Sequence, residues 1–274
     1  GAGTKIMTPA EIKAAYPFYN VDGIVCGSHN LIDEGYFDSG TMFAWWRKKA
    51  RENGVEYLKN MVVGMDRSGD GISSVKLASG ETLDCGTVVN AAGPRASLVA
   101  EMAGVALEIE PRKRYTFIFD CAEDLGMDVP LTIDPTGIHV RSDGDAYMAG
   151  CSPDIDPAVD YDDYEIDRDL FEDKVWPALA HRIPAFERIK IQTQWAGHYA
   201  HNDFDHNVIV GPHSDVANLI LANGFSGHGL QQSPAVGRGV SELITYGEYR
   251  SLDLRPPGHR RIVDREPFIE TAII

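Results

Sequence analysis

Hydrophobic residues follow two different periods along the chain, and the period changes at joints that are rich in glycine. In NLILANG, residues 218–224, a continuous apolar run predicts a buried strand. From Ser233 onward, apolar residues recur at helical spacing, with Ser233 as the expected N-cap and Pro234 at the first helical position. The sequence therefore predicts a strand, a glycine-rich loop and a helix in succession.

The same arrangement occurs earlier in the chain. The apolar run TVVNAAG, residues 87–93, predicts a strand that ends in small residues, and the pattern PRASLVAEMAG predicts a helix that begins after Pro94. Small residues at the end of a strand are typical of places where a sheet edge meets a ligand.

Capping residues place two more helices near the N-terminus. Thr8 followed by Pro9 and Glu11 predicts a short helix that ends before Pro17, and Asp38 or Ser39 is the expected cap of a helix closed by Gly54. Strand patterns separated by turns are expected over residues 55–93, 112–152 and 190–213. Residues 154–173 are dense in aspartate and glutamate; they lack the spacing of a calcium-binding loop, and we expect the solvated start of a helix.

Composition and charge exclude some classes of partner. The 274-residue chain has a net charge of −16, which argues against nucleic acid or an anionic membrane surface as the main partner. The four cysteines are widely spaced and form no CxxC pair, which favours free thiols in a reducing compartment. There is no apolar run of membrane-spanning length and no signal-peptide pattern, so we expect a cytoplasmic protein, with a targeting segment on a missing N-terminal part as the alternative.

The glycine-rich loop before Ser233 has two possible roles. Glycine lets a backbone approach a ligand closely, and a helix N-terminus presents free N–H groups and partial positive charge, so the loop would suit a flat or anionic ligand. Alternatively, it serves only the packing of the strand against the helix. The loop is neither a P-loop nor a dinucleotide-binding fingerprint, because GFSGHG has its glycines at positions 224, 227 and 229.

The two joints together carry a resemblance. GETLDCGTVVNAAGPRA and GFSGHGLQQSPAVGRGVSELI, in this order, resemble the D-amino-acid oxidase-like family of FAD-dependent oxidoreductases, especially the branch of sarcosine oxidase and FAD-dependent oxidoreductase domain-containing proteins. The resemblance runs from PFYNVDGI to IETAII. It implies an α/β (α+β) fold in which residues 1–104 and 205–274 form the remainder of an FAD-binding domain. Residues 105–204 would form a substrate-binding domain built on an antiparallel sheet.

One departure from the family pattern changes what the resemblance implies. The family begins with a βαβ unit that carries G-x-G-x-x-G and a ribose-binding acidic residue, and this chain has neither. We therefore expect a flavoprotein fold without its first βαβ unit, and a missing N-terminal segment or a partner chain that supplies the pyrophosphate site. FAD binding by this chain alone is not implied.

The resemblance assigns cofactor contacts to specific residues. Val63, in NMVVGMD, matches the strand position whose backbone pairs with adenine, and Ala91, Ala92 and Gly93 match the turn beneath the cofactor. The loop around the isoalloxazine ring is matched by eight consecutive residues: Gly224, Phe225, Ser226, Gly227, His228, Gly229, Leu230 and Gln231. Gly197 stands where some members carry a flavin-linking cysteine, so non-covalent FAD is implied. A helix from Ser233 would point at the pyrimidine edge of the ring and favour the negative charge of the reduced flavin.

The resemblance also suggests catalytic and substrate-binding residues. Tyr199 matches a tyrosine over the substrate face, His228 lies beside the ring, and Gln231 stands where sarcosine oxidase has a carboxylate-binding lysine. The neutral Gln231 weakens the case for a simple amino-acid carboxylate as substrate. Arg141 is a candidate for binding an anionic substrate, with a structural role at the end of a strand as the alternative.

Three hypotheses about function remain open at this point. The first is oxidation of a C–N bond in a secondary or tertiary amine or an N-methyl amino acid, with hydride transfer to flavin N5. The second is a non-catalytic assembly or interaction protein that retains the flavoprotein fold. The third is a metal site in HYAHNDFDH, but His198 and His201 would point to opposite faces of a strand, so we expect no bound metal.

Overall fold

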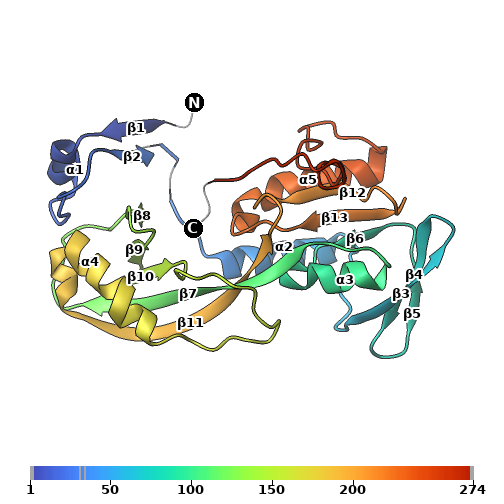
Figure 1. The fold of residues 1–274 in the computed structure, drawn as a ribbon, viewed down its shortest axis with the longest axis horizontal. Helices are drawn as coiled ribbons and strands as arrows, with labels where there is room; N and C mark the ends of the chain where they lie inside the picture. Colours follow the sequence, from blue (N-terminus) through green and yellow to red (C-terminus); the bar gives the residue numbers. More distant parts are fainter. Residues whose placement is uncertain (1–2, 31, 34, 272–274) are drawn as a thin grey trace. The chain divides into compact units, whose positions relative to one another are not determined.

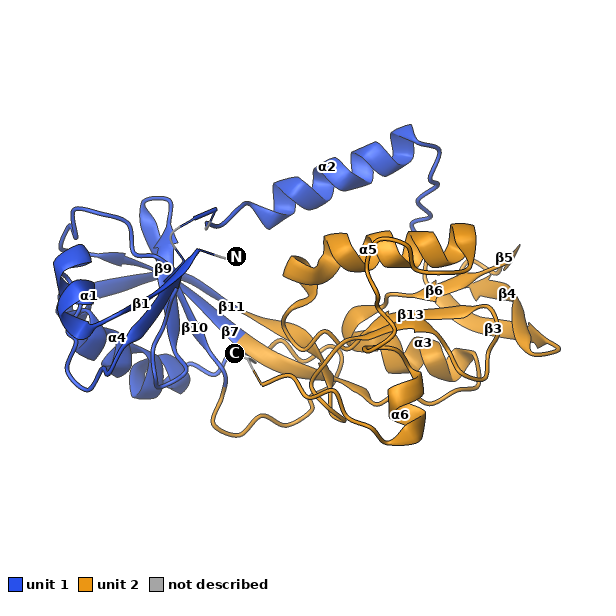
Figure 2. Ribbon diagram, turned by 90° about the horizontal axis from the view of Figure 1, so that it is seen from above, with its two compact units in different colours: residues 1–59, 115–152, 166–195 blue, residues 60–114, 153–165, 196–274 orange. Residues whose placement is uncertain are grey.

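The chain forms two compact units in the computed structural model, which describes residues 3–30, 32–33 and 35–271 (Figure 2). Unit 1 comprises residues 1–59, 115–152 and 166–195, and unit 2 comprises residues 60–114, 153–165 and 196–274. These boundaries reflect contacts within the chain. The FAD-binding and substrate-binding domains expected from the sequence are assignments of function, and they stay a prediction.

An antiparallel sheet runs through unit 1 in the strand order β11-β7-β10-β9-β8 (Figure 1). The strands are β7 (Ile109–Cys121), β8 (Thr132–Ile133), β9 (His139–Asp143), β10 (Ala146–Cys151) and β11 (Ile189–Asn202). β10 pairs antiparallel with both β7 and β9, and β8 pairs antiparallel with β9. Phe117 and Phe119 alternate along β7 and are fully buried, and the Phe119 ring meets that of Phe186 edge to face. β7 and β11 also contribute residues to unit 2.

The remaining elements of unit 1 confirm the predicted helix caps. They are β1 (Thr4–Met7), α1 (Pro9–Ala15), β2 (Gly27–Asn30), α2 (Ser39–Glu52), the π-helical turn η2 (Phe171–Val175), α4 (Trp176–Arg182) and the 3-10 turn η3 (Pro184–Glu187). Thr8 and Glu11 form a reciprocal capping box at α1, and Asp38 caps α2 by accepting the N–H of Thr41.

The acidic segment, residues 153–165, contains no helix or strand, so the helix start predicted over residues 154–173 falls only in the last residues of that range. Helical structure begins only at Asp169, where the Asp167 carboxylate accepts the N–H groups of Asp169 and Leu170. The earlier carboxylates are engaged by basic side chains of β7 and by Arg95, in a segment of irregular backbone with a turn at residues 161–162.

Unit 2 combines two small sheets with helices. β3 (Val62–Ser68), β4 (Gly71–Leu77) and β5 (Thr82–Asp84) form an antiparallel meander. β6 (Val88–Asn90), β12 (Ile209–Pro212) and β13 (Leu219–Asn223) form a second sheet in the order β12-β13-β6, in which β13 and β6 are parallel. The helical elements are the 3-10 turn η1 (Gly93–Arg95), α3 (Ala96–Met102), α5 (Gly229–Tyr246) and α6 (Arg260–Asp264).

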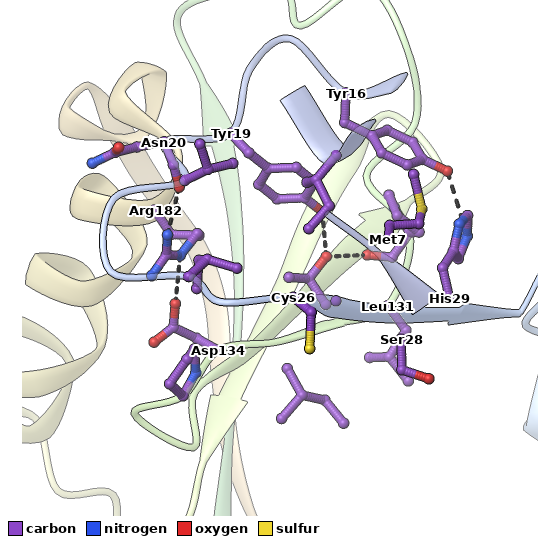
Figure 3. Close-up of a pocket in the computed structure, with 18 residues that line it drawn as sticks. Met7, Tyr16, Tyr19, Asn20, Cys26, Ser28, His29, Leu131, Asp134 and Arg182 are labelled. Atoms are coloured by element: carbon purple, nitrogen blue, oxygen red, sulfur yellow. Dashed lines mark hydrogen bonds and ion pairs between the residues drawn. The ribbon is translucent and has the colours of Figure 1, made fainter. Parts of the chain in front are cut away.

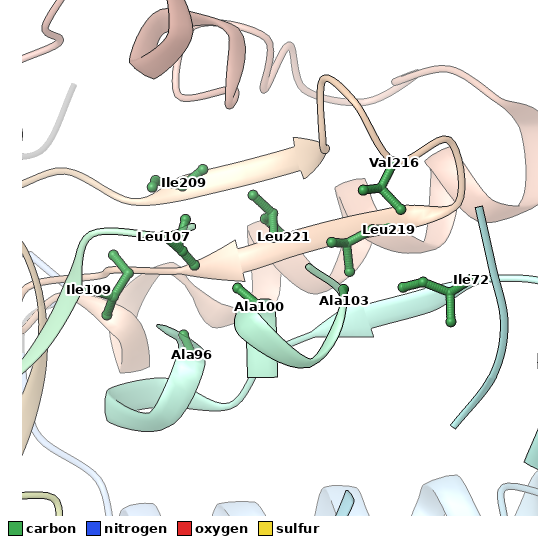
Figure 4. Packing of buried hydrophobic residues seen from close by; sticks show 10 residues of the cluster. All are labelled: Ile72, Ala96, Ala100, Ala103, Leu107, Ile109, Ile209, Val216, Leu219 and Leu221. Carbon is green, nitrogen blue, oxygen red and sulfur yellow. The ribbon is translucent and has the colours of Figure 1, made fainter. Parts of the chain in front are cut away.

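The core of unit 2 fixes α3 against the parallel strands (Figure 4). Ala96, Ala100 and Ala103 are almost fully buried, and their small side chains allow a close approach to Leu219 and Leu221 of β13. This packing fixes the turn that joins β6 to α3, which is one half of the candidate site. Within the part of the chain that the structure describes, no helix is both long and apolar enough to span a bilayer.

Candidate functional site

The two small-residue joints expected from the sequence lie at the same edge of the second sheet of unit 2. Val88, Val89 and Asn90 of β6 pair in parallel with Leu219, Ile220 and Leu221 of β13. Because parallel strands end at the same edge, the turns that follow β6 and β13 are neighbours there. A hydrogen bond of 3.3 Å from the buried Asn223 Nδ2 to Asn90 Oδ1 links the two strand ends.

The turn after β6 is organised by the Asn90 side chain. Asn90 Oδ1 accepts the N–H of Ala92 at 3.2 Å, and Asn90 Nδ2 donates to the carbonyl of Ala96 at 2.9 Å. Gly93 then has a φ of +58°, and a Cβ placed on it would meet no atom of the described residues within 4 Å. The turn is therefore held from behind by Asn90 and leaves open space at Gly93.

The loop after β13 is fixed to β11 by Ser226. The Ser226 N–H donates to the Ala200 carbonyl at 3.0 Å, and Ser226 Oγ accepts the N–H of Asn202 at 3.1 Å. Gly224 and Gly227 have φ values of +69° and +103°. A Cβ on Gly227 would come within 2.6 Å of Tyr199 Cε2, so glycine is required there for the loop to pack on the Tyr199 ring.

The helix after this loop begins earlier than the sequence suggested. α5 begins at Gly229 with His228 as its N-cap, so Ser233 is not the cap and Pro234 lies inside the helix. Pro234 cannot donate to the carbonyl of Leu230, and the Ser233 hydroxyl donates to that carbonyl instead, at 2.8 Å. This substitute bond lets the helix continue through the proline.

Because α5 begins at Gly229 and not at Ser233, a different set of backbone N–H groups lies at the end of the loop. Among the residues that the structure describes, none caps α5 with its side chain, so the N–H groups of Gly229, Leu230 and Gln231 form the open first turn of an 18-residue helix. This end carries partial positive charge and free donors, which suit a ligand with an anionic or carbonyl-rich edge.

The Tyr199 ring contacts a charged residue, Arg114, which the sequence did not identify as part of the site. The guanidinium carbon of Arg114, on β7, lies 4.8 Å from the centroid of the Tyr199 ring. Burial raises the pKa of the Tyr199 phenol, and the charge of Arg114 partly offsets this effect. The signal for Arg114 in the sequence is weak: a run of three basic residues, 112–114, in an otherwise apolar strand pattern.

The other predicted cofactor and substrate residues are placed as follows. Val63 lies at a register shift between β3 and β4, where the described pairing skips it. Gln231 is exposed on the first turn of α5, and His228 is half-buried at the N-cap. Arg141 lies in unit 1, where its guanidinium bonds to the Ser142 carbonyl and the Asp143 carboxylate and covers the Tyr36 ring.

The histidine-rich stretch around Tyr199, residues 198–206, serves packing in this structure. Across the described residues, no three His, Cys, Asp or Glu side chains cluster as metal ligands would. His198 stacks on Tyr164 at 4.3 Å, and Asp205 makes a fully buried ion pair with Arg261 at 2.6 Å. Burial, with the nearby charges of Arg112 and His206, lowers the pKa of His201 to about 4.

Unit 1 contains a separate cavity of about 420 Å³ (Figure 3). Tyr16, Tyr19 and His29 line it together with apolar side chains, and Arg182 at its wall is paired with Asp134 at 2.7 Å. The described residues that line this cavity include none of those predicted for the cofactor or the substrate.

Comparison with known proteins gives one family match and several relatives. Residues 1–243 match the family model described as FAD dependent oxidoreductase. The chain is 38% identical over 305 residues to FAD-dependent oxidoreductase domain-containing protein 1 of Xenopus laevis, covering 100% of this chain and 61% of the relative. It is 24% identical to mitochondrial sarcosine dehydrogenase of Mus musculus, covering 98% of this chain and 31% of that protein.

A solved structure supports the same relationship. The crystal structure of L-proline dehydrogenase from P. horikoshii superposes with a TM-score of 0.87 at 28% identity, covering 97% of this chain and 71% of that chain. This similarity confirms the mixed α/β flavoprotein fold that the sequence predicted.

Substitution of Gly227 tests the contact between the loop and Tyr199. Gly227→Ala forces a Cβ into the Tyr199 ring at a positive φ, so the free energy of unfolding should fall by about 1–3 kcal/mol, with a changed near-UV circular dichroism signal. Gly237→Ala is the control: a Cβ at this exposed position in α5 would meet no described atom within 4 Å, and stability should hold or rise by about 0.5–1 kcal/mol. Equal effects of the two substitutions in urea titrations would contradict the assigned contact.

The buried His201 predicts that stability depends on pH. Its pKa is about 4 in the fold against the ordinary value of 6.5, so between these values the unfolded chain binds more protons and stability falls as the pH falls. His201→Gln should therefore lose less unfolding free energy between pH 7 and pH 5 than the unaltered chain, measured by urea denaturation. His181→Gln, at an exposed position, should follow the unaltered chain; a parallel response of His201→Gln would exclude this role for His201.

Proposed function

Since the chain belongs to the family of FAD-dependent oxidoreductases, we propose that the protein oxidises a C–N bond in a secondary or tertiary amine or an N-methyl amino acid. The relatives named for sarcosine and L-proline support this class of substrate, because both molecules are secondary amines that carry a carboxylate. The observation that carries the proposal is the pair of turns at the edge shared by β6 and β13, with the open amides of α5 beside them.

The residues at this edge fit an FAD ring on two counts. The space beside Gly93 lets a flat group approach the backbone, and the uncapped first turn of α5 offers N–H donors to a polar ring edge. We propose that the backbone of Val63, which the described pairing of β3 and β4 skips, binds the adenine of FAD. Position 197 is a glycine, so no cysteine is available there for a covalent link to the flavin, which supports non-covalent FAD.

FAD, when bound, accepts a hydride from the carbon next to the amine nitrogen. The residues of this chain orient the reactants. Tyr199, with its pKa raised by burial, keeps its proton at neutral pH and can donate a hydrogen bond to a substrate on the ring. His228 and Gln231, at the start of α5, are the other side chains that we propose contact the cofactor or substrate.

We propose that tight binding of FAD also uses residues outside this chain. The chain spans about three fifths of the length of the FAD-dependent oxidoreductase domain-containing protein 1 relatives that it matches. We propose that an N-terminal segment, or a partner chain, supplies the pyrophosphate-binding βαβ unit, and that the ring and adenine contacts come from this chain.

Anaerobic reduction of the bound cofactor tests the proposed reaction. Sarcosine, dimethylglycine or L-proline, mixed with the FAD-loaded protein in its longest native form, should bleach the visible flavin band. N-Acetylglycine should not bleach it, because the lone pair of its amide nitrogen is delocalised into the carbonyl and does not drive oxidation as the lone pair of an amine does. An oxidised band that persists with all three amines would exclude this substrate class.

A further inference from the structure

We propose that Arg114 binds the carboxylate of the substrate, and that Asp156 holds this position until a substrate carboxylate replaces it. The inference rests on the proposed function, and it adds the residue that selects for an acidic amine. It also answers the difficulty raised by Gln231, which is neutral where a carboxylate-binding lysine was expected.

Arg114 has the geometry of a carboxylate-binding residue. Its Nη1 and Nη2 atoms each lie 2.8 Å from an oxygen of Asp156, in the two-point arrangement that guanidinium groups form with carboxylates. The same guanidinium covers the Tyr199 ring, which packs on Gly227 of the loop after β13. The carboxylate of Asp156 is therefore separated from the proposed ring-binding loop by two side chains, those of Arg114 and Tyr199.

Replacement of Asp156 exchanges one carboxylate for another. Arg114 is 10% exposed, so removal of Asp156 alone would leave a buried positive charge without this partner, at considerable cost. A substrate carboxylate in the same place restores both bonds, and the net cost of the exchange is small.

Arg112 gives the displaced Asp156 side chain a second partner. Arg112 Nη1 lies 4.0 Å from Asp156 Oδ2 and also donates to the Asp156 backbone carbonyl. A rotation of the Asp156 side chain toward Arg112 would therefore keep its charge paired while its backbone stays in place. No movement of the whole acidic segment is required.

The rest of the acidic segment is attached independently of Asp156. Asp163 pairs with Lys113 at 2.9 Å, Asp162 pairs with Arg95 at 2.6 Å, and the Val159 N–H donates to the Pro111 carbonyl at 3.0 Å. These contacts keep the segment in position when the Asp156 side chain changes partner. They also supply a matched control, because Asp162 lies on the same segment and is 88% exposed.

Calorimetric titration of the 274-residue chain with benzoate tests the exchange without any flavin. Asp156→Asn removes the competing charge, so it should bind benzoate about tenfold more tightly than the unaltered chain, the scale of the difference between a charge-assisted and a neutral hydrogen bond. Asp162→Asn makes the same change of net charge away from Arg114 and should leave the affinity unchanged. Arg114→Gln should abolish binding, Arg114→Lys should weaken it, and benzamide should not bind to any form.

The outcomes separate this inference from the proposed function. Unchanged or weaker benzoate binding by Asp156→Asn, or equal gains in Asp156→Asn and Asp162→Asn, would overturn it, as would full binding by Arg114→Gln. Benzoate binding through Arg114 in a protein whose flavin is not reduced by amines would contradict only the amine-oxidation proposal. Amine oxidation with an unchanged KM in Arg114→Gln would contradict only the role of Arg114.

Discussion

Parallel pairing of β6 with β13 is the constraint on which the candidate site depends. The two strands are far apart in the sequence, and their pairing brings the Ala91–Gly93 turn to the loop that begins at Gly224. The buried bond between Asn90 and Asn223 links the strand ends, and the alanine face of α3 supports them from the core. A backbone slip in this pair would separate the turns and displace the first turn of α5, so the proposed ring site requires this register.

Charge is distributed unevenly around the paired strands β6 and β13. The net charge of −16 does not exclude an anionic ligand at the site, because charge is balanced locally there. The basic side chains of β7 pair with carboxylates of the acidic segment. Arg114 is the member of this group that also touches Tyr199. The arrangement provides one positive charge beside the proposed ring site, already paired in the geometry that an amino-acid carboxylate would adopt.

Local signals in the sequence predicted the elements well; one error involves a local hydrogen bond inside α5, and the others come from tertiary contacts. Thr8 and Asp38 cap their helices as expected, because a cap depends on residues within one turn. Ser233 and Pro234 carry an equally good local signal for a helix start, yet α5 begins at Gly229 because the Ser233 hydroxyl satisfies the carbonyl that Pro234 cannot. The acidic segment is not helical, and its carboxylates bind basic residues from other parts of the chain. Arg114 could not be identified from the sequence for the same reason: its partners, Asp156 and Tyr199, come from two other segments.

Equilibrium titration of the protein with FAD, made with its longest native form so that the proposed pyrophosphate site is present and followed by quenching of flavin fluorescence, is the decisive measurement for this edge of the sheet. In the proposed site the ring lies against the open backbone at Gly93, where a Cβ would meet no atom of the described residues within 4 Å. We expect saturable quenching for the unaltered protein and for Gly237→Ala, and loss of quenching for Gly93→Val, whose branched side chain would fill that space at a positive φ. No quenching by the unaltered protein, or equal quenching by Gly93→Val, would contradict the claim that the edge shared by β6 and β13 holds the flavin.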